Sequence, residues 1–409
     1  MTPMDAHHRP DDETSLDRFC AMVLGDPSLQ DALRRPNEIQ ELVALVVDTA
    51  RRAGIVLVAT KVQAALRGRL SGDGDPTVQL RETPLPPDQW LPIGTAWRGD
   101  RLLVEWSWFG DRRLREPFFA GDVQRSLSEP FNRLFRAVTP IERLAQWLER
   151  RPPLRPSGFI FHMSRCGSTL VAQMLAACTD NIVISEAAPI DEVVRARQVR
   201  SDLGEDEQAR WLAAIVGALG QPRAGERRLF VKLDSWHTLA MPLFRRAFPD
   251  VPWVFLYRDP VEVMVSQRRL PGMHVIPGAF APELFGIVPN FDRRDDYCAR
   301  VLARICEPIV AEHERGGGLL VNYRDLPQAV WTTIMPHFGV AAGAEDRAAM
   351  AEAAKYDAKL PDYEFTPDAE ARQRAATSAT RAAAAAWLVD VYGRLEALRS
   401  CASGSRPDA

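Results

Sequence analysis

A short polar segment at residues 164–169, Ser-Arg-Cys-Gly-Ser-Thr, combines the residue types that bind phosphate groups. It lies between an apolar run at 159–163, typical of a buried strand, and a segment at 170–177 with an apolar helical face. A strand, a glycine-containing turn and a helix start point several backbone N–H groups at one place, where the helix adds about half a positive charge. Gly167 lets the backbone approach an anion closely. Arg165 and the Ser168 and Thr169 hydroxyls can donate hydrogen bonds to that anion. The segment therefore predicts a phosphate-binding loop.

The loop differs from the common ATP-binding pattern, Gly-x-x-x-x-Gly-Lys-[Ser/Thr], because no lysine follows Gly167. The hydroxyl that follows this lysine and holds magnesium is missing as well. These absences argue against an ATPase or an ordinary kinase. Two alternatives remain open at this point: a small-molecule kinase on the same scaffold, and a non-catalytic protein that binds a nucleotide or a peptide.

A second candidate anion site follows the apolar run at 253–257. Residues 258–266 read Arg-Asp-Pro-Val-Glu-Val-Met-Val-Ser. Arg258 falls at the strand end, and Ser266 falls two turns into the helix that Pro260 begins. The pair could bind a second phosphate. The alternative is an ordinary helix start, with Asp259 and Pro260 as its capping residues.

Both segments resemble the donor-binding motifs of sulfotransferases that use 3′-phosphoadenosine 5′-phosphosulfate. The first is similar to the 5′-phosphosulfate loop, Pro-[Lys/Arg]-Ser-Gly-[Ser/Thr]-Thr, with Ser164 where Pro is common and Cys166 where Ser is usual. The second matches all the marked positions of the 3′-phosphate motif, Arg-[Asn/Asp]-Pro-x-[Asp/Glu]-x-x-x-Ser. Residues 319–326, Leu-Leu-Val-Asn-Tyr-Arg-Asp-Leu, resemble a later strand and loop of that family, with Arg324 in place of Glu. The three segments fall within residues 157–345, and the family domain would extend to about residue 400.

The resemblance implies transfer of a sulfuryl group to a hydroxyl or amine, with the donor as co-substrate and no metal ion. Arg165 would stabilise the leaving phosphate, and Lys232 is a second candidate cation. The general base has two candidates, each just after a predicted strand. Around Glu186 the sequence resembles carbohydrate and tyrosyl-protein sulfotransferases, which use a Glu as the base. Cytosolic sulfotransferases place a base His after the strand that corresponds to the one before His237, but their local Lys-x-His pattern is not reproduced here. The sequence contains no set of residues with metal-ligand spacing.

From residue 158 onward, apolar strands alternate with longer helical segments, which predicts an α/β fold with a parallel sheet between helices. The expected strands are 159–163, 182–185, 229–233, 253–257 and 319–323. An Ala-rich stretch at 378–398 predicts one helix. The organisation we predict is a helical module at 14–70, a Trp-rich α+β region and linker at 71–152, a sulfotransferase-like domain at 153–400 and a tail at 401–409. We interpret the middle tryptophans, Trp90, Trp97, Trp106 and Trp108, as a packing core.

The N-terminal module is predicted to consist of short helices, two of them separated by Gly25, Asp26 and Pro27. Asp26 fits an N-cap, with Pro27 at the first helical position. The apolar-and-turn pattern of residues 14–68 resembles a small helical domain that is associated with nitrogen-fixation proteins and serves as a leader region of modified peptides. A generic helical bundle is the alternative. The resemblance makes a peptide acceptor one hypothesis beside a small molecule or a glycan.

Composition limits the function classes. The chain has 409 residues and a formal net charge of −3, so no global basic field attracts nucleic acid. No apolar run approaches the roughly 18–20 residues that span a membrane, and residues 1–13 lack the apolar core of a signal peptide. The six cysteines form no Cys-x-x-Cys pair. We therefore expect free thiols, a cytoplasmic location and, from the abundance of Ala, Arg and Pro, a bacterial source.

Overall fold

The computed structural model describes residues 14–68, 82–359, 363 and 369–404. The chain forms two compact units: the first comprises residues 1–111 and 123–147, and the second comprises 112–122 and 148–409. The predicted helical module and most of the Trp-rich region thus belong to one unit. Three segments lie outside the described residues: the N-terminus at 1–13, for which we predicted no signal peptide, the linker residues 69–81 and the tail residues 405–409.

The first unit combines short helices with an antiparallel sheet. Asp26 accepts hydrogen bonds from the N–H groups of Ser28 and Leu29 at 2.8 and 3.2 Å, which confirms the predicted N-cap. The sheet has the strand order β1-β2-β3. The elements are α1 (Ser15–Gly25), α2 (Pro27–Leu33), α3 (Ile39–Arg52), α4 (Ala59–Gly68), β1 (Trp90–Arg98), β2 (Arg101–Trp108), α6 (Pro130–Leu134), β3 (Ala137–Pro140) and η1 (Ile141–Arg143). Two further helices are divided between the units: α5 (Phe119–Ser128) begins in the second unit, and α7 (Leu144–Glu149) ends in it.

Tryptophans form the core of the first unit. Trp90, Trp106 and Trp147 are buried. The Trp106 Nε1–H donates to Thr139 Oγ1 at 2.8 Å, and the Trp147 Nε1–H donates to the Pro86 carbonyl at 2.7 Å. Buried indole N–H groups with partners are what a packed core requires. The interpretation of this cluster as core is therefore confirmed for its buried members.

The second unit contains a five-stranded parallel sheet with the order β5-β6-β4-β7-β8. Its strands are β4 (Pro156–His162), β5 (Asn181–Ser185), β6 (Arg228–Lys232), β7 (Trp253–Tyr257) and β8 (Gly318–Asn322). All five coincide with predicted strands to within a few residues, and their apolar side chains are largely buried. The predicted α/β fold class is confirmed.

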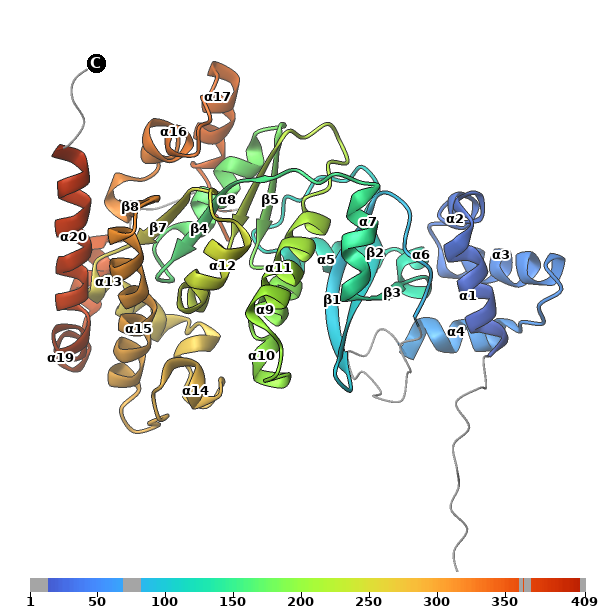
Figure 1. The fold of residues 1–409 in the computed structure, drawn as a ribbon, viewed down its shortest axis with the longest axis horizontal. Coiled ribbons are helices and arrows are strands. Elements are labelled where there is room, and N and C mark those ends of the chain that lie inside the picture. Colours follow the sequence, from blue (N-terminus) through green and yellow to red (C-terminus); the bar gives the residue numbers. More distant parts are fainter. Residues whose placement is uncertain (1–13, 69–81, 360–362, 364–368, 405–409) are drawn as a thin grey trace, which may run out of the picture. The chain divides into compact units, whose positions relative to one another are not determined.

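Helices cover both faces of this sheet. α11, α12 and α15 lie on one face, and α8 packs on the other, against β4, β5 and β6 (Figure 1). The helices and short turns are α8 (Ser168–Ala177), α9 (Ala188–Val194), α10 (Ala196–Val199), α11 (Glu205–Leu219), η2 (Ser235–Ala240), α12 (Met241–Ala247), α13 (Pro260–Arg269), η3 (Met273–Val275), α14 (Pro282–Phe285), α15 (Arg294–Glu314), η4 (Tyr323–Asp325), η5 (Val330–Ile334), α16 (Met335–His337), α17 (Ala344–Ala353), α18 (Ala369–Ala375), α19 (Ser378–Trp387) and α20 (Val389–Gly404).

The C-terminal prediction of one helix at 378–398 is wrong in detail. The stretch forms two helices, α19 and α20, which meet at the buried Leu388. α19 packs on α15, whereas α20 also packs on β8. Glu396 of α20 accepts hydrogen bonds from Asn322 of β8 and from Tyr257 of β7. The break is confined to Leu388, whose N–H donates to the Ala384 carbonyl and whose carbonyl accepts from the Tyr392 N–H, both at 2.9 Å. α20 also includes residues 401–404 of the predicted tail.

The strand order determines where a ligand can bind. β4 is central, and the chain leaves it toward β5 at one edge, while the later strands β7 and β8 lie on its other side. In an open parallel sheet, a crevice forms at the carboxyl ends of the strands where the connections diverge in this way. The predicted phosphate loop at 164–169 follows β4 and therefore lies at this crevice.

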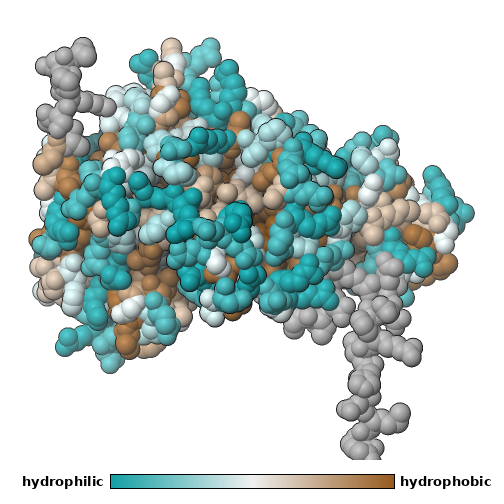
Figure 2. Space-filling view, in the orientation of Figure 1, coloured by the Kyte–Doolittle hydropathy of each residue, from teal (hydrophilic) through white to brown (hydrophobic). Residues whose placement is uncertain are grey.

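The visible surface is mostly hydrophilic, with small separate apolar patches (Figure 2). Within the described ranges, no helix is long and apolar enough to cross a membrane.

Candidate active site

A cavity of about 490 Å³ opens at the carboxyl edge of the sheet in the second unit. Its size falls within the usual range of small-ligand sites. The whole predicted phosphate loop lines it, together with the candidate base Glu186 and with Arg258 and Ser266 of the second motif. The other two predicted residues, Lys232 and His237, are not part of the cavity wall. The structure thus brings two separate sequence motifs to one cavity.

The loop has the backbone of an anion cradle. Ser164, Arg165 and Gly167 all have positive φ, at 75°, 53° and 85°. Glu186, which also lines the cavity, has φ 52°. Non-glycine residues in this region are uncommon and cluster at functional sites. Gly167 is the N-cap of α8 and provides no side-chain cap. The first N–H groups of a helix with such a start can bind an anion.

Gly167 cannot carry a side chain without disturbing the loop. A Cβ atom built on it would lie 2.7 Å from Leu326 Cδ1 and 2.8 Å from Tyr323 Cδ2. Both contacts come from the segment after β8, which closes over the loop. The glycine is therefore required by its positive φ and by this close approach.

The start of the loop is held by the preceding strand. The Ser164 N–H donates to His162 Nδ1 at 3.0 Å, so the proton of this imidazole is on Nε2, which lies 2.9 Å from the Leu233 carbonyl. Burial lowers the pKa of His162. On the other side, Gln267 of α13 donates to Ser164 Oγ at 3.0 Å. His162 thus has a structural role in shaping the loop, as a neutral ring.

Cys166 replaces the usual serine of the motif, and its side chain is turned away from the anion position. Sγ donates to the Leu256 carbonyl of β7 at 3.0 Å, and the side chain is fully buried. Burial raises the pKa of the Cys166 thiol to about 12. Only the backbone of this residue can take part in anion binding.

We expect Cys166 to be unreactive in the folded chain, because the thiolate is the reactive species and its burial suppresses ionisation. All six cysteines are free thiols, and Cys401 is exposed, whereas Cys166, Cys178, Cys298 and Cys306 are buried. Titration with a thiol reagent at pH 8 should modify Cys401 rapidly and the four buried thiols only after denaturant is added. Rapid modification of Cys166 in native protein, located by peptide mapping, would contradict this orientation.

The cavity is rich in cations. Arg165 lines it, and its guanidinium donates to the Leu270 carbonyl at the end of α13. Arg372 of α18 and Lys359 line the same cavity. Burial and the neighbouring charges of Arg165 and Lys232 lower the pKa of Lys359 to about 8. Several cations gathered in one cavity can attract an anion that carries more than one charge.

Arg258 is placed at the end of β7, as the sequence predicted, and is buried. Its Nε donates to Glu262 at 2.5 Å, one turn into α13, and its guanidinium carbon lies 3.8 Å from the centre of the Tyr323 ring. Ser266 lies on the same helix and faces the same cavity. Asp259 caps α13 by accepting from the Val261 and Glu262 N–H groups. The helix-capping interpretation of this motif is therefore confirmed, while Arg258 and Ser266 line the cavity.

Lys232 lies beneath the loop, in the interior. It is 0% exposed, and its Nζ lies 2.5 Å from Glu186 Oε1 and 3.4 Å from both Thr169 Oγ1 and Ser185 Oγ. Burial alone would raise the pKa of Glu186, but the Lys232 ammonium and His162 hold it well below its usual range. Lys232 itself does not line the cavity, but it contacts two residues that do, Glu186 and Thr169.

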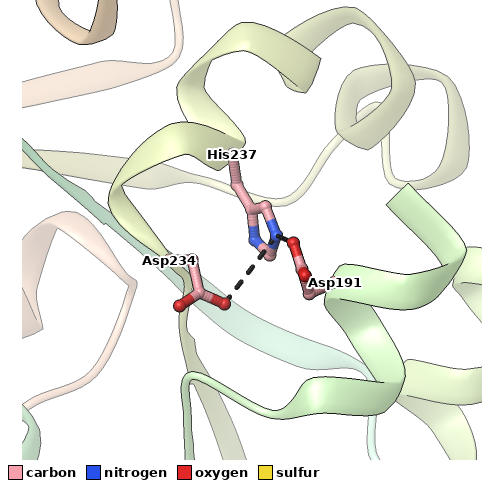
Figure 3. Close-up of side chains that lie close together, drawn as sticks. All are labelled: Asp191, Asp234 and His237. Atoms are coloured by element: carbon pink, nitrogen blue, oxygen red, sulfur yellow. Dashed lines mark hydrogen bonds and ion pairs between the residues drawn. The ribbon is translucent and has the colours of Figure 1, made fainter. Parts of the chain in front are cut away.

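His237 is 1% exposed and faces Asp191 at 3.0 Å and Asp234 at 3.8 Å (Figure 3). Burial raises the pKa of Asp191, but the hydrogen bonds from His237 and Trp236 bring it to about 2. The structure therefore places His237 behind the cavity wall and Asp234 in the wall.

Sequence reasoning missed several residues of this cavity. Asp234 lies two residues beyond β6, and Glu186 directly follows β5, so a search of the residues after each strand end could have found Asp234. Lys359 and Arg372 belong to no motif, because they approach from segments more than 180 residues beyond the loop. No local pattern in the sequence signals them.

No family model and no curated protein sequence matches this chain. Similar solved structures include the sulfotransferase STF9 from Mycobacterium avium, which is 14% identical, covers 57% of this chain and 79% of its own, and has a TM-score of 0.37. The sulfotransferase domain from the curacin biosynthetic pathway is 17% identical over 57% of this chain and 97% of its own, with a TM-score of 0.39. The sulfotransferase domain from the Synechococcus PCC 7002 olefin synthase is 18% identical over 62% and 97%, with a TM-score of 0.35.

Proposed function

We propose that this chain is a sulfotransferase that uses 3′-phosphoadenosine 5′-phosphosulfate as donor and a hydroxyl or amine compound as acceptor. The observation that carries the proposal is that the phosphate loop and the Arg258–Ser266 pair line one cavity. One anion cradle would suit any phosphorylated ligand. Two cradles in one cavity suit a nucleotide that carries a phosphosulfate at one end and a phosphate at the other.

In this proposal, the loop N–H groups, the α8 N-terminus and Arg165 hold the 5′-phosphosulfate. Arg258 and Ser266 hold the 3′-phosphate, with Tyr323 against the Arg258 guanidinium. Lys359 and Arg372 add positive charge along the cavity. The reaction is an in-line displacement at sulfur, in which the protein positions the two reactants and stabilises the charge of the leaving phosphate.

Calorimetry with adenosine 3′,5′-bisphosphate tests the donor site without knowledge of the acceptor. We expect the full chain to bind this bisphosphate at least about 100-fold more tightly than adenosine 5′-monophosphate, because charge-assisted hydrogen bonds contribute about 1.5–3 kcal/mol each. Arg258→Ala should remove this preference. Arg269→Ala is the matched control, since this exposed arginine ends the same helix away from the cavity.

Two results would contradict the proposal. The first is tighter binding of ATP than of the bisphosphate, with magnesium-dependent ATP turnover, which would indicate a kinase on this scaffold. The second is bisphosphate binding that Arg258→Ala leaves unchanged, because the 3′-phosphate would then be bound elsewhere.

A further inference from the structure

We infer that Asp234 accepts the proton of the acceptor in the proposed sulfuryl transfer, and that His237 and Asp191 position it. The inference rests on the function proposed above. Asp234 lies two residues beyond the end of β6 and lines the cavity that holds the phosphate loop. Its side chain is 11% exposed. The carboxylate is thus accessible from the cavity and largely removed from bulk water, as a general base should be.

Glu186, another carboxylate of the cavity, is engaged by its neighbours. Its Oε1 lies 2.5 Å from Lys232 Nζ and 3.4 Å from His162 Nε2. A carboxylate that is paired with a buried ammonium has little affinity for a further proton, which agrees with the lowered pKa of Glu186. Proton transfer to Glu186 would also leave Lys232 as an unpaired buried charge. Glu186 is therefore better suited to holding Lys232 in place beside Thr169 than to acid–base catalysis.

Asp234 forms no ion pair with an ammonium group of the described residues. Its ionic neighbour in that part of the chain is the His237 ring, with Nε2 at 3.8 Å. Burial raises the pKa of Asp234 to about 7; His237 and Lys232 oppose the rise, while Glu186 and Asp191 add to it. The other titratable or charged groups that line the cavity are His162, Arg165, Cys166, Arg258, His274, Tyr323, Tyr356, Asp357, Lys359 and Arg372. A base that titrates near neutral pH has the proton affinity that general base catalysis needs.

His237 and Asp191 fix the turn that carries Asp234. A carboxylate can only accept, so the His237 Nε2–H donates to Asp191 Oδ1, which also accepts from Trp236 Nε1 at 2.7 Å. The other oxygen of Asp191 accepts from Arg195 Nε at 2.8 Å. Figure 3 shows the imidazole between the two carboxylates. His237 therefore separates two like charges and holds η2 in place.

The same three side chains have ligand atoms within 4.8 Å of one another, a spacing that a metal ion could bridge. The donors around Asp191 argue for the hydrogen-bonded arrangement instead. Both oxygens of Asp191 already accept N–H groups, from Trp236, His237 and Arg195. These N–H groups occupy the sides of the Asp191 carboxylate oxygens at which a cation would bind.

Atoms and electrons balance in the proposed step. The acceptor oxygen or nitrogen forms a bond to sulfur, and its proton passes to a carboxylate oxygen of Asp234. The bond between sulfur and the bridging oxygen breaks, and its electron pair stays on the 5′-phosphate. The products are the sulfated acceptor, adenosine 3′,5′-bisphosphate and protonated Asp234, which returns its proton to water.

The test uses the full chain and 3′-phosphoadenosine 5′-phosphosulfate, with water as the acceptor and release of the bisphosphate as the measured quantity. Asp234→Asn should lower kcat by about 10²–10⁴-fold, the usual contribution of a general base, and leave the calorimetric Kd of the bisphosphate within about threefold. Wild-type kcat should rise with pH through the pKa of Asp234, since only the ionised form accepts a proton. Asp250→Asn, at an exposed aspartate away from the cavity, is the control.

The positioning residues have a signature that a purely structural role would not produce. His237→Gln should move the midpoint of the pH profile upward, because His237 lowers the pKa of Asp234, whereas Asp191→Asn should move it downward.

The Tm difference between Asp234→Asn and wild type should also grow as pH rises from about 4 to about 7. A group whose pKa is raised from 3.8 to about 7 on folding loses its stabilising contribution over this window, and Asn does not titrate.

Each outcome decides between the two proposals. Turnover by Asp234→Asn within threefold of wild type, or a pH profile that flattens in Glu186→Gln instead, overturns the role of Asp234 alone. Loss of bisphosphate binding in Asp234→Asn also overturns it, because Asp234 would then be a binding residue. A wild-type chain that does not bind the bisphosphate, or that binds ATP more tightly, overturns the proposed function itself.

Discussion

Lys232→Met is expected to destabilise the second unit by about 3–5 kcal/mol, the usual effect of breaking a buried ion pair by removing one partner. The substitution leaves the Glu186 carboxylate beside an apolar side chain, and it also removes the Nζ contacts with Thr169 and Ser185. Urea unfolding of the full chain, followed by tryptophan fluorescence and circular dichroism, measures the effect as a shift of the transition midpoint.

Two further variants separate the ion pair from general disruption. In the double variant Lys232→Met with Glu186→Gln, no uncompensated charge remains, so we expect much of the loss to be recovered. Lys355→Met breaks the exposed pair with Glu352 and should change stability by less than about 1 kcal/mol. A double variant no more stable than Lys232→Met would show that the pair is not the cause.

The same pair predicts a pH dependence. The pKa of Glu186 is lowered on folding from the ordinary value of 4.5. Its contribution to stability is therefore fully present above pH of about 4.5 and is lost as pH falls toward the lowered value in the folded chain. The difference in unfolding free energy between wild type and Glu186→Gln should shrink in the same direction.

Gly167→Ala is expected to weaken binding of adenosine 3′,5′-bisphosphate by at least about 100-fold, which corresponds to the loss of two hydrogen bonds to a charged group. Gly167 has φ 85°, and a Cβ would lie within 3 Å of Leu326 and Tyr323, so the loop must move. The N–H groups of the loop and of the first turn of α8 then no longer point at one place.

Gly204→Ala is the matched control for this variant. Gly204 is also the N-cap of a helix, α11, but it has φ −65°, and a Cβ added there would meet no neighbouring atom within 4 Å. Its substitution should leave the affinity unchanged. Calorimetry on both variants, with circular dichroism as a check on folding, measures the effect; an unchanged Kd in a folded Gly167→Ala would show that the loop backbone does not bind the phosphate.

The sequence by itself determined the features that depend on neighbours along the chain. Apolar runs at regular intervals specified the five strands, because each run buries itself on both faces of a parallel sheet. The loop at 164–169 and the segment at 258–266 were recognisable because a strand end, a turn and a helix start are consecutive in the chain. Parallel strand order then brings both to one edge, as the shared cavity shows.

Only the tertiary structure decided how the side chains around these motifs are used. Cys166 turns into the core because β7 offers it a carbonyl, and Lys232 is buried because Glu186 from the next strand pairs with it. His237 and Asp234 are three residues apart, yet a single 3-10 turn sends one into the interior and the other to the cavity. Burial and partner choice depend on residues distant in sequence. For this reason the sequence could propose Glu186 and His237 as bases, while the packed structure directs attention to Asp234.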